Sequence, residues 1–144
     1  MMTLALADAI IAGARRRAAA AGSKPLTIAV VDAGGLPVAL AREDGCGAKR
    51  AKLSFDKAES ALALGMPTRT LAQFWLSNKD MHAVLCASTG SSLLPLAGGV
   101  LVRDAEGFVI GAVGVSGGSL ETEETFVIEA IHEAGFASDP AEIA

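Results

Sequence analysis

Aromatic residues and clustered basic residues are both scarce in this sequence of 144 residues. Only 4% of the residues are aromatic and tyrosine is absent, so few side chains could stack on nucleic-acid bases. The formal net charge is −4, whereas binding to phosphate backbones or anionic membranes calls for clustered lysine and arginine. The one basic cluster, residues 15–17, falls in a predicted helix, where a solvated face explains it. We therefore expect neither a nucleic-acid partner nor a membrane partner.

Cysteine is rare and long apolar runs are missing. Cys46 and Cys86 lie far apart, without the paired spacing of a zinc site or of a disulfide framework. No run of about 18 uncharged apolar residues could form a transmembrane helix. The first residues are apolar but lack the basic leader of a signal peptide. The sequence thus predicts a reduced, cytoplasmic protein without a structural metal site.

Apolar residues, in contrast, make up 51% of the chain. A chain of this length can bury a core of its own, so we expect one domain over residues 1–144. So small a domain cannot hide all of its apolar surface, and we expect a homo-oligomer with apolar interfaces.

The hydrophobic pattern predicts helices that alternate with two β-hairpins. The predicted helices cover residues 4–21, 48–64, 68–75 and 119–134, and the predicted strands cover residues 26–32, 36–42, 100–102 and 108–115. Residues 77–92 have a weaker pattern and predict a mobile loop with at most one turn of regular structure, and residues 138–144 predict a frayed tail. Because the strands pair as hairpins, the order predicts an α/β fold of the α+β type, with helices packed on an antiparallel sheet.

The most informative stretch runs from residue 98 to residue 124. Its second hairpin strand ends at Gly117-Gly118, and a helix starts directly afterwards. Gly111 and Gly114 interrupt that strand, which indicates a bulge or the close approach of another group. We expect open backbone at this corner, and therefore a ligand site.

Three acids, Glu121, Glu123 and Glu124, lie at the start of the last helix. Favourable interaction with the helix dipole accounts for them, and their charge disfavours a phosphate there. Glu123 has a second interpretation, because one carboxylate next to the backbone of Ser116-Gly117-Gly118 could hold a polar ligand or act as a general base.

Lys57 is the second candidate, since it lies within the apolar arc of the helix over residues 48–64. Its ammonium must reach solvent, pair with an acid of the sheet, or bind the carboxylate of a ligand. Thr68 can cap the helix that follows, and Ser60 is expected to face water.

The two histidines have different environments. His132 falls opposite the apolar side of the last helix, so we expect it to be a surface residue. His82 lies in the predicted loop, four residues before Cys86, where an acid–base role or a haem-iron role competes with a structural one.

Several motifs point to a known family. The sequence reads VVDAGG at 30–35, FDKAESALALGMPTRTL at 55–71 and GFVIGAVGVSGG at 107–118. In this order the motifs resemble the GlcG/HbpS family, which is haem-binding-like and similar to the C-terminal domain of PduO-type proteins. The resemblance implies a profilin-like or PAS-like antiparallel sheet flanked by helices, assembly into homo-oligomers, and a link to haem or corrinoid binding or to catabolic pathways.

The resemblance also implies a set of residues at the ligand site. Carried over by motif, they are Lys57, Thr68, Ser116, Gly117, Gly118 and Glu123. Residues 77–96 depart from the family pattern, and we expect this segment to shape specificity.

Two functions from different classes follow. The first is a binding protein for haem, corrinoid or another planar organic molecule. The second is a cofactor-independent enzyme of the tautomerase, lyase or hydratase type, in which Lys57 holds the carboxylate of a small organic acid and Glu123 or His82 moves a proton. An oligomeric scaffold without a ligand is the third possibility.

Overall fold

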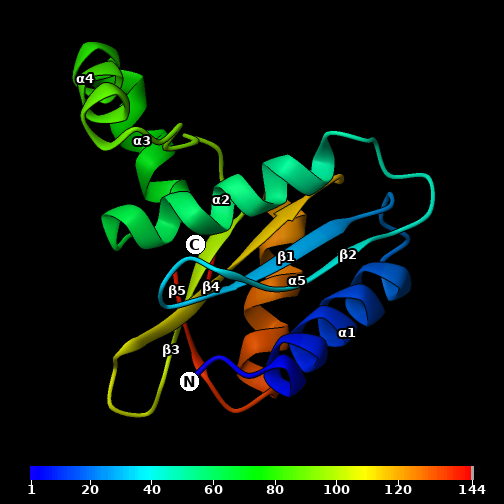
Figure 1. Cartoon of the computed structure of the whole chain (residues 1–144). Helices are drawn as coiled ribbons and strands as arrows, with labels where there is room; N and C mark the ends of the chain where they lie inside the picture. Colours follow the sequence, from blue (N-terminus) through cyan, green and yellow to red (C-terminus); the bar gives the residue numbers. More distant parts are fainter. Residues whose placement is uncertain (144) are drawn as a thin grey trace.

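A five-stranded antiparallel sheet lies at the centre of the computed structural model, which describes residues 1–143 (Figure 1). The strands lie in the order β2-β1-β4-β3-β5. Their bounds are β1 Thr27–Asp32, β2 Pro37–Arg42, β3 Gly99–Arg103, β4 Val109–Ser116 and β5 Ala137–Asp139. Both predicted hairpins are present, and β1 of the first pairs with β4 of the second.

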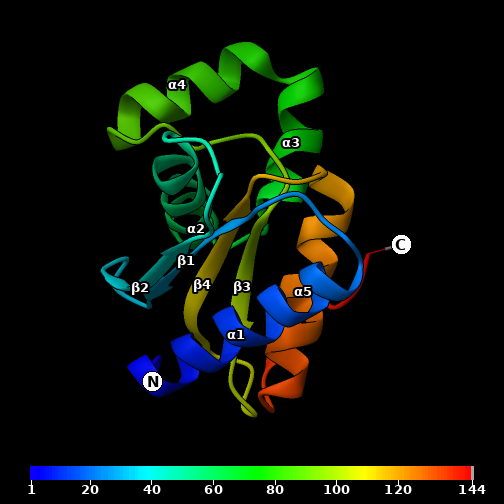
Figure 2. The same ribbon diagram turned by 90° about the vertical axis from the view of Figure 1, so that its right-hand side faces the viewer.

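Helices cover both faces of this sheet, as the turned view in Figure 2 shows. Their bounds are α1 Leu4–Ala20, α2 Arg50–Leu64, α3 Thr68–Ser77, α4 Lys79–Thr89 and α5 Leu120–Glu133. α1 and α5 pack side by side on one face, and α2 lies along the other. The predicted α+β class, an antiparallel sheet flanked by helices, is confirmed. None of the helices described is long and apolar enough to cross a membrane.

Alternation along the strands divides the core between the two faces. On β3, Val100 and Val102 point to the cluster under α1 and α5, whereas Leu101 points to the cluster under α2. β4 alternates in the same way, with Val113 on the first side and Ala112 on the second. This period of two is what a strand covered on both faces requires.

Small residues on the α2 side of the sheet let this helix approach closely. Ala29, Gly114 and Gly99 lie next to one another across β1, β4 and β3. A Cβ atom on Gly114 would collide with the backbone carbonyl of Ser54 on α2. The glycine within the strand therefore marks close approach, as predicted, and the approaching group is a helix backbone.

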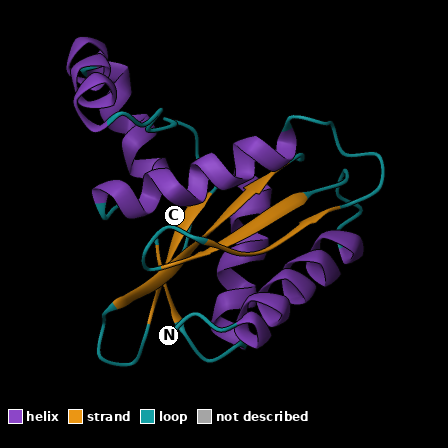
Figure 3. Cartoon of the chain, viewed as in Figure 1, coloured by secondary structure: helices purple, strands orange, loops and turns teal. Residues whose placement is uncertain are grey.

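The loop predicted over residues 77–92 is wrong, because Lys79–Thr89 forms α4 (Figure 3). This helix packs on no helix or strand other than α3 in the described part of the chain, so no apolar stripe marks it in the sequence. The sequence did contain a marker for the end of α4, because Gly90 adopts the left-handed conformation (φ 69°) with which helices commonly end.

Two smaller predictions are also wrong. The tail is not frayed from residue 138, because β5 pairs with β3 and Asp139 forms an ion pair with Arg103. Ser60 does not face water, because the chain after α4 crosses α2 there and the Leu94 N–H donates to the Ser60 hydroxyl at 2.9 Å. In both cases a distant segment covers a surface that local periodicity assigns to solvent.

Candidate functional site

A buried ion pair joins α2 to α5. The Lys57 ammonium lies 3.4 Å from Oε1 of Glu123, and the two side chains are 2% and 1% exposed. Lys57 also donates a hydrogen bond of 2.8 Å to the backbone carbonyl of Val115 on β4. The ammonium therefore does not reach solvent, and it links the middle helix, the sheet and the last helix.

The second oxygen of Glu123 holds the glycine corner. Gly118 donates its backbone N–H to Oε2 of Glu123 at 2.9 Å. Gly117 has φ 133°, and a Cβ atom there would collide with the backbone carbonyl of Pro25. The predicted meeting of an amine, an acid and bare glycine backbone is thus present, whereas its role in binding stays a prediction.

Burial controls the electrostatics of this pair. It lowers the pKa of Lys57, and the neighbouring Glu123 carboxylate opposes that shift. It raises the pKa of Glu123, and Lys57 and the Gly118 amide oppose that shift. Each group is displaced towards its neutral form, which suits a proton carrier but is equally expected of a sequestered structural pair.

Glu124 forms a second buried anchor on the same turn of α5. Its Oε1 accepts a hydrogen bond of 2.7 Å from Arg69 of α3, and its Oε2 accepts the Gly98 N–H at 3.1 Å. Interaction with the helix dipole is therefore not the whole role of Glu123 and Glu124, because both are buried and accept backbone N–H groups. The side chain of Glu121 lies outside the described part of the structure.

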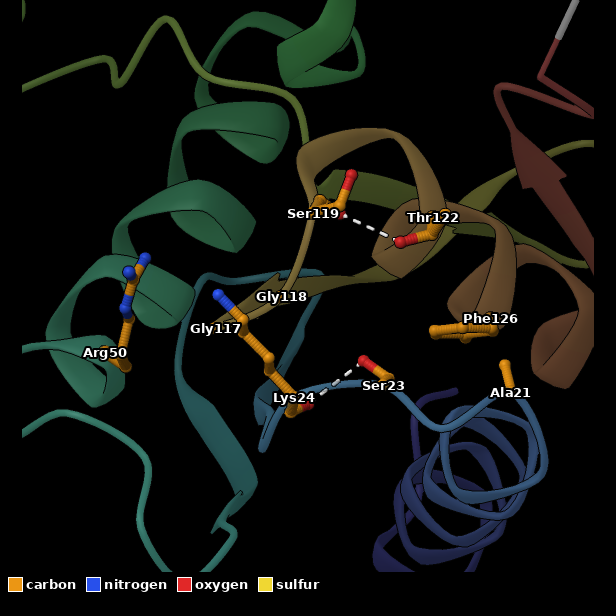
Figure 4. A pocket seen from close by; sticks show the side chains of 9 residues that line it. All are labelled: Ala21, Ser23, Lys24, Arg50, Gly117, Gly118, Ser119, Thr122 and Phe126. Atoms are coloured by element: carbon orange, nitrogen blue, oxygen red, sulfur yellow. Dashed lines mark hydrogen bonds between the residues drawn. The ribbon is translucent and has the colours of Figure 1, made fainter.

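A surface pocket of about 410 Å³ opens against the outer side of the glycine corner (Figure 4). Two basic side chains, Lys24 and Arg50, stand at one end of it, and Phe126 with Ala21 stands at the other. The backbone of Gly117 and Gly118 lies between the two ends. The remaining lining residues are Ser23, Ser119 and Thr122.

Two predicted site residues, Ser116 and Thr68, support this corner from behind. Ser116 is fully buried, and its hydroxyl accepts a hydrogen bond of 3.0 Å from Arg50. Thr68 is fully buried and accepts the Gly99 N–H at 2.7 Å. The predicted helix cap at Thr68 is wrong, since Pro67 holds the N-cap position and the Thr68 hydroxyl turns to the sheet. Neither residue lines the pocket.

His82 lies apart from this site, on α4. Its Nε2 is 2.7 Å from the backbone carbonyl of Leu93. A carbonyl only accepts, so this contact places the proton on Nε2. The ring is 9% exposed and also contacts Cys86 at 3.7 Å. The structure thus gives His82 a packing role between α4 and the segment that follows it.

Sequence reasoning missed the residues that give the pocket its chemistry. Arg50 had a signal, because it stands seven residues before Lys57 and so faces the same side of α2, towards the end of β4. Lys24 and Phe126 had none, since the connection from α1 to β1 places Lys24 at the corner and the packing of α5 against α1 places Phe126 there. In the described part of the chain, no group of three or more His, Cys, Asp or Glu side chains could hold a metal ion.

Comparisons with known proteins give a consistent assignment. The family model described as "Haem degrading protein HbpS-like" matches residues 2–132. The solved protein ORFY of Klebsiella pneumoniae is 28% identical, with a TM-score of 0.83 over 93% of this chain and 90% of that one. A double mutant of Streptomyces reticuli HbpS is also 28% identical, with a TM-score of 0.77 over 92% and 86% of the two chains. PduOC, solved as a haem complex, is 22% identical, with a TM-score of 0.81 over 96% and 98%, and so shows the fold alone. The search of curated proteins gives no match.

Proposed function

The chain belongs to the HbpS-like family, and from this premise we propose that it binds a small planar organic molecule in the pocket beside Gly117 and Gly118. Membership confirms the resemblance that the motifs predicted. The observation that carries the proposal is the pocket itself, because about 410 Å³ lies within the usual range of small-molecule sites. The glycine backbone that forms its floor is held in place by Glu123.

Haem fits this pocket poorly. Haem iron takes an axial ligand from His, Cys, Met or Tyr, and none of these residue types lines the pocket. His82 lies on α4 and its Nε2 is engaged by Leu93. The described residues therefore favour another planar molecule over haem, although the family and PduOC carry haem in their descriptions.

A cofactor-independent enzyme is the second candidate, because an acid and an amine, each with its pKa displaced towards the neutral form, lie next to the glycine backbone that lines the pocket. A substrate in the pocket would meet the backbone of Gly117 and Gly118 before either side chain, because the pair lies buried behind it. We therefore rank binding ahead of catalysis. Accelerated tautomerisation of phenylpyruvate that disappears in Glu123→Gln would reverse this order.

Protein-detected NMR tests the binding proposal with three planar probes: benzamide, benzoate and haemin. At least one is expected to shift the amide signals of residues 117–119. Thr122→Trp, which fills the pocket from the first turn of α5, should abolish the shifts. Thr70→Trp, at the equivalent position of α3 and outside the pocket, should leave them intact.

Two outcomes contradict the proposal. If none of the three probes shifts the signals of residues 117–119, the pocket is not a binding site for planar organic molecules. If haemin gives a stoichiometric Soret band that His82→Ala removes, haem is the ligand and its site lies at α4.

We also propose that the chain forms homo-oligomers through the arm made by α3 and α4. Leu76, Met81 and Val84 on this arm are 69%, 53% and 60% exposed, which is unusual for three large apolar side chains on adjoining helices. A second copy of the chain would cover them. Light scattering should give a mass above one chain, and Val84→Glu should lower it.

We also propose that the protein is cytoplasmic. Cys46 and Cys86 are both free thiols, as expected in a reducing compartment.

A further inference from the structure

The two ends of the pocket differ in chemistry, and this difference specifies a class of ligand. We propose that the pocket is selective for an organic anion, a carboxylate attached to a planar apolar body. The carboxylate lies between Lys24 and Arg50, and the body packs on Phe126. This inference rests on the proposed function, because it names the ligand class of the same pocket.

The cationic end has charge available for a ligand. In the described part of the chain, the Lys24 ammonium has no hydrogen bond or ion pair, and Figure 4 shows it directed towards Gly117 and Gly118. Arg50 donates a hydrogen bond of 3.0 Å to Ser116, which orients the guanidinium, and no other hydrogen bond of this side chain is found among the described residues. A guanidinium held in this way is suited to a carboxylate, which accepts two parallel hydrogen bonds.

The nearby acids that the structure describes have partners outside the pocket lining. Glu123 lies behind Gly118, with one oxygen on its N–H and the other towards Lys57. Glu43 is occupied by Arg15 and by the Leu26 N–H. No carboxylate lines the pocket among the side chains that the structure describes. Among the described side chains, the charged ones that line the pocket are therefore the two basic ones, although the chain as a whole carries −4.

The opposite end sets the second half of the selectivity. Phe126 and Ala21 supply an apolar wall where α5 meets the end of α1. An aromatic ring offers a planar ligand a stacking surface, which inorganic phosphate cannot use. A small anion without an apolar body would contact only one end of the pocket.

The test compares benzoate with its neutral analogue benzamide and with inorganic phosphate, by NMR shifts of residues 117–119. Benzoate is expected to bind at least about fivefold more tightly than benzamide, and more tightly than phosphate. Lys24→Gln should weaken benzoate binding about fivefold and leave benzamide unchanged. Lys49→Gln removes the same charge next to Arg50 but outside the pocket, and should leave benzoate binding unchanged.

Each contrary result has a distinct meaning. Equal binding of benzoate and benzamide overturns the anion selectivity and leaves the binding pocket in place. Phosphate binding as tight as benzoate overturns the role of Phe126, and equal losses in Lys24→Gln and Lys49→Gln overturn the assignment of the cation. Shifts with benzamide but not with benzoate overturn the inference alone, whereas no shift with any of the planar probes overturns the proposed function as well.

Discussion

Replacing Lys57 by methionine tests whether the buried pair holds the glycine corner together. Methionine keeps an unbranched side chain of similar length but removes the charge. In Lys57→Met, the Glu123 carboxylate keeps the Gly118 N–H as its one hydrogen-bond partner among the described residues, and the Val115 carbonyl loses its 2.8 Å hydrogen bond. The substitution thus leaves a buried carboxylate without its cation and supplies no new hydrogen-bond donor in its place.

The expected cost follows from the burial of both groups. Removing one partner of a buried ion pair typically costs about 3–5 kcal/mol, because the remaining charge is uncompensated. With side chains only 2% and 1% exposed, solvent screening does not reduce this figure. Domains of this size have a total stability of about 5–15 kcal/mol, so Lys57→Met should lose a large part of it.

The decisive measurement is a double-mutant cycle by urea unfolding, followed by far-UV circular dichroism. Glu123→Gln alone should also cost about 3–5 kcal/mol, because the buried Lys57 ammonium loses its carboxylate although the amide oxygen can still accept the Gly118 N–H. The double variant should be more stable than the sum of the two losses by at least about 2 kcal/mol. Losses that add to within about 0.5 kcal/mol, or a loss below about 1 kcal/mol in Lys57→Met, would refute the reasoning.

Three further predictions concern packing, pH and assembly. Gly114→Ala should destabilise the protein by about 3 kcal/mol or more in thermal or urea unfolding, because the added Cβ meets the Ser54 carbonyl. Gly47→Ala, where a Cβ makes only an ordinary contact, should change the stability little. Equal effects of the two substitutions would contradict the close approach of α2. Arg17 holds the pKa of Glu133 below its ordinary value of 4.5, so the stabilisation from this ion pair is present above about pH 4.5 and is lost as the pH falls further. Glu133→Gln should therefore flatten the dependence of the urea midpoint on pH below about 4.5. An unchanged dependence would contradict the assignment. Light scattering at micromolar concentration should give a mass above that of one chain, and a monomer would remove the proposed interface.

The fold was predictable wherever local pattern and tertiary packing agree. The two hairpins follow from apolar runs bounded by turns that contain glycine, and the hydroxyl of Thr3, directly before α1, accepts the Leu6 N–H as an N-cap residue does. α4 was missed because it packs on one neighbour only, so burial imposed no period on its sequence. β5 was missed because three residues are too short for a pattern, and its pairing with β3 is a tertiary effect.

The centre of the candidate site was predictable for a physical reason. A lysine inside an apolar arc needs a partner, and in the folded chain Glu123, in the first turn of the last helix, provides one. The pocket lining was not predictable in the same way, because Lys24 is a plain surface residue by every local criterion. Its position beside Gly117 depends on the path of the chain from α1 into β1, which only the folded structure provides.

The acids at the start of α5 show how a charge count along the sequence can give the wrong sign for a site. Counted locally, Glu121, Glu123 and Glu124 place negative charge at the glycine corner and disfavour a phosphate there. In the folded chain two of these acids turn inwards, Glu123 to Lys57 and Gly118, and Glu124 to Arg69 and Gly98. Glu123 fixes the backbone that follows β4, and Glu124 fixes the backbone that precedes β3. Lys24 and Arg50 line the pocket at the outer side of the corner, and Glu123, one of the acids that disfavoured a phosphate, holds the backbone of Gly118 beside them.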